Sequence, residues 1–158
     1  MSTRASIYRH PVHPMLIVFP LGLWIFSVVC NLVYVLGGPP VWYTVALYAM
    51  GGGIVGAVLA AVPGLIDFLT LPQSRVQTIA LSHMIVNIVA LTIFVIAFAI
   101  SIFSAEYTVM PFILSLFGLV AVGVGGWLGG ALVYEYGVGV EPRQRQEAEE
   151  PQETVLRR

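Results

Sequence analysis

Charged residues are scarce in this sequence. Aspartate, glutamate, lysine and arginine make up 9% of its 158 residues, whereas soluble domains average about 25%. Hydrophobic residues make up 58%, so polar groups could not cover a water-exposed surface. The composition therefore excludes an ordinary soluble domain and predicts that a lipid bilayer is the main partner of the chain.

Three further absences narrow the function. The sequence has no lysine, all seven basic residues are arginines and the net charge is -1, so no nucleic-acid partner is expected. The single cysteine, Cys30, lies in an apolar run and has no partner for an intrachain disulfide. Apart from Ser82 beside His83, no serine or cysteine has an evident base. Hydrolase chemistry is therefore not expected, while a redox role stays open.

Four long apolar runs follow one another along the chain. Each is longer than the about 20 residues that cross a bilayer core as a helix, and none shows the polar alternation of a strand. They predict spans at about 15–36, 41–69, 78–103 and 108–134. The first run is too long for a signal peptide and has no small-residue cleavage site, so we interpret it as a permanent span.

The connections between the runs are short, which makes neighbouring helices antiparallel. We therefore predict an all-α fold, an integral membrane four-helix bundle over 15–136. An N-terminal segment, 1–14, precedes it. The tail, 137–158, is rich in Gln, Glu, Arg and Pro and cannot bury enough apolar surface to order itself, so we expect disorder.

The arginines indicate the orientation. With four spans they all fall on one side of the membrane: Arg4, Arg9, Arg75, Arg143, Arg145, Arg157 and Arg158. The positive-inside rule makes that side cytoplasmic. We expect a multi-pass protein of a bacterial inner membrane with both termini in the cytoplasm, and with Trp42, Tyr43 and Tyr107 at the opposite interface.

Small residues recur every four positions in the second and fourth spans. The ladders are Gly52, Gly56, Ala60 and Gly64, then Gly53, Ala57 and Ala61, and in the fourth span Ala121, Gly125 and Gly129 beside Gly126 and Gly130. Such spacing lets membrane helices approach closely, within one bundle or in a homodimer; it could also make room for a flat cofactor. Pro20 and Pro63 predict kinks near Phe19 and Val62.

The rare polar residues gather at the predicted cytoplasmic end. His10 and His13 precede the first span, Asp67 lies near the end of the second, and His83 lies near the start of the third with Asn87 one turn deeper. Ionisable residues in a span usually face the bundle interior or a water-filled cavity. Any functional site is therefore expected at this end.

Three interpretations of the polar group stay open. His13 and His83, on parallel helices, could be axial ligands of a haem b, with Arg9 or Arg75 on the propionates. Asp67 or a backbone carbonyl would then orient an imidazole. A non-haem metal on His10, His13, Asp67 and His83 is the second interpretation. In the third, Asp67 pairs with Arg75 or His83 and the cluster only holds the loops.

Several blocks of the sequence resemble a bacterial membrane family known as domain of unknown function 2231. The blocks are His10-Pro11-Val12-His13-Pro14-Met15-Leu16-Ile17-Val18-Phe19-Pro20, Pro63-Gly64-Leu65-Ile66-Asp67, His83 with Asn87, Gly125-Gly126-Trp127-Leu128-Gly129-Gly130 with Tyr134, and Gly137-Val138-Gly139-Val140. The resemblance covers about residues 5–140.

This resemblance implies a four-helix membrane protein without an assigned activity. Some similar proteins are fused to Rieske iron–sulfur or cytochrome c domains, which implies electron transfer. The chain departs from the pattern in having Val18 where many members carry a second histidine, Asn31 where many carry an acid, and no histidine near Tyr136. His13, His83 and Asp67 remain as the shared polar residues.

The leading hypothesis is thus a haem-b-binding electron-transfer module that works with redox proteins or a quinone. The alternative is a structural or interaction protein of a membrane complex without a cofactor. A small transporter is the third hypothesis, weakened because the spans carry no paired charges at the bilayer midplane, where transporters place their sites.

Overall fold

The structure is a computed structural model that describes residues 5–8 and 10–140. Its elements are β1 (Ser6–Ile7), β2 (His10–Pro11), α1 (Val12–Leu16), α2 (Val18–Val35), α3 (Val41–Leu69), α4 (Arg75–Phe103) and α5 (Met110–Tyr134). The tail predicted to be disordered falls, from residue 141 onward, outside the described residues.

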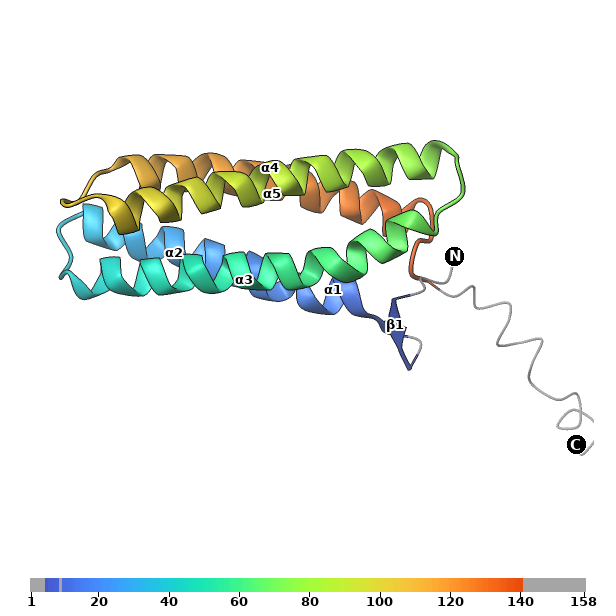
Figure 1. The fold of residues 1–158 in the computed structure, drawn as a ribbon, viewed down its shortest axis with the longest axis horizontal. Coiled ribbons are helices and arrows are strands. Elements are labelled where there is room, and N and C mark those ends of the chain that lie inside the picture. Colours follow the sequence, from blue (N-terminus) through green and yellow to red (C-terminus); the bar gives the residue numbers. More distant parts are fainter. Residues whose placement is uncertain (1–4, 9, 141–158) are drawn as a thin grey trace, which may run out of the picture.

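The predicted four-helix membrane fold is confirmed. Four stretches of helix are long and apolar enough to cross a membrane: α1 with α2, then α3, α4 and α5. They form two antiparallel hairpins, α2 with α3 and α4 with α5, and the two hairpins lie against each other along their length (Figure 1). Large apolar side chains such as Phe117 and Val120 are exposed on the outside, where lipid would cover them.

The first span is broken at Ile17, which separates α1 from α2. The sequence predicted a kink near Phe19, two residues later. Pro20 has no backbone N–H, so the carbonyl of Leu16 loses its helical donor. The interruption is confined to that bond, because Ile17 keeps helical dihedrals and its N–H and carbonyl still bond to His13 and Leu21. At Pro63, by contrast, α3 continues as one helix from Val41 to Leu69.

The chain begins with a short strand pair that the sequence did not predict. β1 and β2 are antiparallel, with Ser6 opposite Pro11, and α1 follows directly. The backbone N–H of Ala5 donates to Asp67 Oδ1 at 2.9 Å. The N-terminal segment is thereby attached to the end of α3, beside the site described below.

Two helix ends depend on glycine. Gly37 follows α2 with a φ of 95°, and Gly137 follows α5 with a φ of 64°. After α2 the N–H of Gly38 donates to the carbonyl of Val33 at 2.9 Å and that of Gly37 to the carbonyl of Tyr34 at 3.0 Å, which is a Schellman motif. After α5, by contrast, the N–H of Gly137 donates to the carbonyl of Val133 at 3.1 Å, as in the simpler αL motif. A side chain at these left-handed positions would be strained.

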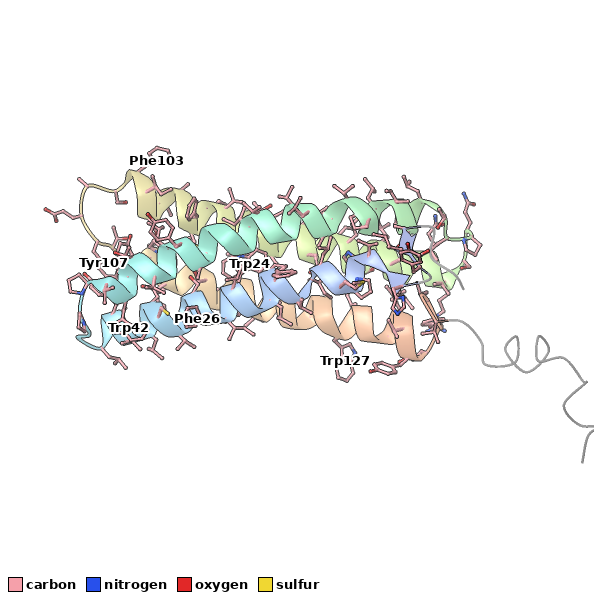
Figure 2. All side chains as sticks on the ribbon, turned by 90° about the horizontal axis from the view of Figure 1, so that it is seen from below. Trp24, Phe26, Trp42, Phe103, Tyr107 and Trp127 are labelled. Carbon is pink, nitrogen blue, oxygen red and sulfur yellow. The ribbon has the colours of Figure 1, made fainter. Side chains whose placement is uncertain are left out.

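Aromatic rings lie on glycines at the centre of the bundle. Trp24 of α2 contacts Gly53 of α3, and Phe94 of α4 lies against Gly118 of α5. The two rings stack on each other, with centroids 4.1 Å apart and planes 8° apart. Trp24 therefore sits in the interior (Figure 2), in contact across both hairpins.

A glycine pair on α5 tests this packing. A Cβ at Gly118 would come within 2.7 Å of the Phe94 ring, whereas one at Gly123 would meet nothing within 4 Å. We predict that Gly118→Ala lowers the free energy of unfolding in detergent by about 1–3 kcal/mol, as overpacking does. Gly123→Ala is the control and should change it by less than about 0.5 kcal/mol. Equal effects of the two changes would contradict the packing.

Candidate functional site: a histidine pair between the hairpins

His13 and His83 meet where the two hairpins face each other. His13 belongs to α1 and His83 to α4, and these helices run in the same direction. The ring centroids are 6.2 Å apart and the ring planes are 86° apart. The sequence placed both histidines at the same end of the bundle, and the structure brings them side by side.

Each imidazole is tied to its own hairpin through Nδ1. His13 Nδ1 lies 2.8 Å from the carbonyl oxygen of Ala60 on α3. His83 Nδ1 lies 2.8 Å from the carbonyl oxygen of Gly125 on α5. A carbonyl can only accept, so each neutral imidazole carries its proton on Nδ1 and keeps an electron pair on Nε2.

Glycine allows both imidazoles to approach the neighbouring helix. A Cβ at Gly64 would lie 2.8 Å from His13 Nδ1, and one at Gly129 would lie 3.1 Å from His83 Cε1. The small-residue ladders thus contact the site residues. Gly126 and Gly130 lie on another face of α5, where a Cβ would meet nothing within 4 Å; whether that face forms a homodimer stays a prediction.

Asn87 supports His83 from one turn deeper in α4. Its Nδ2 donates to the His83 carbonyl at 2.8 Å. The same nitrogen lies 3.3 Å from Nδ1 and 3.4 Å from Nε2 of the His83 ring, and with the proton on Nδ1 only Nε2 could accept from it. A Cβ at Gly125 would lie 2.8 Å from the same amide nitrogen. Gly125 therefore serves the site twice, by accepting from His83 and by leaving room for Asn87.

The other predicted site residues lie around the pair. Asp67 accepts from Ala5, as described above, and among the described residues it forms no ion pair with Arg75 and no hydrogen bond with His83. His10 is exposed, and its Nδ1 contacts the Tyr8 carbonyl at 2.8 Å. Arg75 is exposed at the start of α4, and Arg9 lies outside the described residues.

Residues 5–8 and 10–140 contain no group of three or more His, Cys, Asp and Glu side chains that could hold a metal ion. A site built by protein ligands alone commonly has three or four of them. The described residues thus give no geometric support to the four-residue metal site on His10, His13, Asp67 and His83. The histidine pair is the donor set that the structure offers.

A tyrosine cluster closes the opposite end of the bundle. The rings of Tyr34, Tyr43 and Tyr107 lie 4.8 to 5.4 Å from one another, and Tyr43 donates to the Ser101 carbonyl at 3.2 Å. Burial and the neighbouring Tyr34 and Tyr43 raise the pKa of Tyr107, so its phenol is neutral near pH 7. Trp42 and Tyr107 also mark this end in Figure 2.

The fold and the site define the class of protein: a four-span membrane protein in which the two histidines of the described helices form a pair between two hairpins. The model of a protein family described as "Predicted membrane protein (DUF2231)" matches residues 9–142. The chain belongs to this family. No curated protein and no solved structure matches it.

The tautomers of the histidine pair can be measured. We predict that His13 and His83 both carry the neutral-state proton on Nδ1, because each Nδ1 faces a carbonyl oxygen. Nitrogen NMR of protein with 15N-labelled histidine distinguishes a protonated ring nitrogen from an unprotonated one. A proton on Nε2 in either residue would contradict the geometry.

Matched glycine variants identify the signals. Gly129→Ala should shift the His83 resonances, because its Cβ would press on the ring, whereas Gly126→Ala should leave them unchanged.

Proposed function

We propose that this protein is a membrane electron-transfer module that binds a haem b with His13 and His83 as its axial ligands. The observation that carries the proposal is the meeting of two imidazoles from parallel helices, each held through Nδ1. A haem accepts such a pair because the porphyrin fills the other four iron positions and leaves one on each face.

The separation of the rings supports this ligation. Two metal–nitrogen bonds of about 2 Å put the bonded nitrogens about 4 Å apart, and one ring radius of about 1 Å at each end brings the centroids to about 6 Å. The observed distance is 6.2 Å. Perpendicular ring planes are compatible, because each plane can contain the line through the iron at any rotation about it.

The hydrogen bonds at Nδ1 also support it. Histidine ligands commonly donate their second N–H to a carbonyl or carboxylate, which fixes the ring and makes the ligating nitrogen more basic. Here the carbonyls of Ala60 and Gly125 are in that position. These two backbone carbonyls, rather than Asp67, would then orient the imidazoles.

Bound in this way, a haem would supply one-electron chemistry, with its potential set by the two nitrogen ligands and the apolar surroundings. The chain would provide the ligands, their orientation and a site without bulk water. Arg75, at the same end of the bundle, is the described cation available for a propionate. Redox proteins or a quinone are the partners that this role requires.

The location we propose is a bacterial inner membrane with both termini in the cytoplasm. The first and last described residues lie at the same end of the bundle (Figure 1), as does Arg75. Arginine excess marks the cytoplasmic side. The histidine pair would then lie toward the cytoplasmic leaflet, with the tyrosine cluster at the outer face.

A structural or interaction protein remains the second candidate. It is favoured by one observation: both Nδ1 atoms already have partners within the bundle, so the histidines could serve to join helices. A transporter has less support, because the only Asp, Glu, Lys and Arg residues in the described helices are Asp67, near the end of α3, and Arg75, at the start of α4, so none lies at the bilayer midplane.

Optical spectroscopy tests the haem. Protein expressed with ample haem and purified in detergent should show a Soret band and a reduced spectrum typical of haem b. His83→Ala should abolish the six-coordinate spectrum, and His13→Ala should do the same. His10→Ala is the matched control and should leave it intact, because His10 is exposed and contacts Tyr8 instead.

The absence of a Soret band from wild-type protein under these conditions would overturn the haem proposal. The structural candidate then predicts a different result. Asp67→Asn and His83→Ala would lower the thermal midpoint or the recovery of an assembled complex, and no variant would change a visible spectrum.

A further inference from the structure

Several residues that build the interior of the bundle have an identical or similar residue at a constant offset in the other hairpin. His13 and His83 are 70 positions apart, and so are Trp24 and Phe94. On the second helix of each hairpin the shift is 65 positions: Gly53 corresponds to Gly118, Ala60 to Gly125 and Gly64 to Gly129.

The contacts correspond as well as the positions. The first histidine bonds to the carbonyl of residue 60, and its equivalent bonds to the carbonyl of residue 125, both at 2.8 Å. The glycine four residues further along the second helix lies against each imidazole, and the glycine seven residues before the carbonyl lies against each central ring. Three contacts of the first hairpin thus recur in the second, at residues 70 positions later on the first helix and 65 positions later on the second helix.

Burial follows the same shifts at seven positions of each hairpin, whereas other buried residues, among them Asn31, Ala49 and Pro63, have half-buried equivalents. The buried residues Pro20, Trp24 and Ser27 correspond to the buried Ala90, Phe94 and Ala97, and the buried Ala46, Met50, Gly53 and Ala60 correspond to the buried Pro111, Ser115, Gly118 and Gly125. The topology of an up-down bundle makes the two helices of each hairpin antiparallel. It does not require that corresponding residues of the two hairpins be buried at the same positions. The agreement therefore needs another reason.

Equivalent residues also meet each other. His13 contacts His83, and Trp24 stacks on Phe94. Two equivalent parts that touch at the same residue lie about a twofold axis at that point. Since corresponding helices run in the same direction, this axis runs along the bundle, as in parallel membrane repeats related about the membrane normal.

We infer that the chain is a tandem repeat of one helical hairpin and that its ligand site lies on the pseudo-twofold axis. Each copy contributes the same half-site: an imidazole, an accepting carbonyl and a glycine. A ligand on the axis would be one that takes a nitrogen donor on each of two opposite faces, which is a planar metal macrocycle. This choice of ligand rests on the proposed function, whereas the repeat does not.

The copies differ in most of their side chains, including two polar ones near the site. Asn87 corresponds to Ile17, and Asp67 corresponds to Leu132. One difference explains another: the amide of Asn87 leaves no room for a Cβ on residue 125, and that position is glycine where the first copy has Ala60. The repeat thus persists in backbone and register while most of its side chains differ.

An exchange of side chains across the axis tests the repeat in the full-length protein. The double variant Trp24→Phe/Phe94→Trp moves the indole to the equivalent position of the other copy. The control, Trp24→Phe/Phe98→Trp, makes the same first change but moves the indole one turn out of register. Phe94 is 0% exposed and Phe98 is half-buried, so space alone favours the control.

The repeat predicts instead that the in-register exchange is the more stable of the two variants. The in-register exchange should keep its thermal midpoint in detergent within about 3 °C of wild type, and the control should lose roughly 5 °C or more, as a change of 1–2 kcal/mol does at this size. Tryptophan emission from a further variant set in which Trp42 and Trp127 are phenylalanine should stay that of a buried indole. Unfolding of the in-register variant, or a control at least as stable, would overturn the repeat.

This experiment needs no haem, so the two proposals can fail separately. If wild-type protein binds no haem but the in-register exchange is tolerated, the repeat stands and the proposed function is wrong. If haem is bound but the exchange is no better than its control, the histidines are ligands that owe nothing to a repeat.

Discussion

The contact between a ring and a glycine on the neighbouring helix determines how this bundle is built. Lipid is as apolar as the side chains, so membrane helices associate through close packing and hydrogen bonds rather than through the hydrophobic effect. Gly53 and Gly118 receive the central rings, and Gly64 and Gly129 receive the imidazoles. Because each ring is fitted within its own hairpin, the two hairpins can then join through ring-to-ring contacts, the Trp24–Phe94 stack and the histidine pair.

Much of this fold was predictable, because a membrane span must be apolar and must satisfy its backbone hydrogen bonds within itself. The apolar runs gave the four helices, and their short connections placed His13 and His83 at one end. The interruption falls at Ile17 rather than near Phe19, because Pro20 leaves the carbonyl of Leu16, one turn earlier, without its helical donor. The acceptors for the histidines were not predictable: they are backbone carbonyls, which every residue possesses, so no side chain at Ala60 or Gly125 signals the role.

The internal repeat is present in the sequence but is too sparse to recognise there. Histidine at 13 and 83 and glycine at 53 and 118 are matches that chance could supply in an apolar chain, and the shifts of 70 and 65 differ. The shift changes from 70 to 65 at the connections far from the histidines. There α5 begins at Met110, which corresponds to position 45, whereas α3 begins at Val41. Only the contacts reveal that each match occupies the same place in its hairpin.

The site therefore combines equivalent donors with unequal supports. His13 lies on the five-residue α1, which the break at Ile17 separates from α2 and which the Ala5–Asp67 hydrogen bond helps to hold at α3. His83 lies within the long α4, and Asn87 binds its carbonyl from the same helix. Pro20, which causes the break, corresponds to Ala90, and Asp67 corresponds to Leu132. The two halves thus bond the same ring nitrogen, Nδ1, to a carbonyl of their own hairpin, but the segment that carries the imidazole is held by a tertiary contact in the first copy and is part of a long helix in the second.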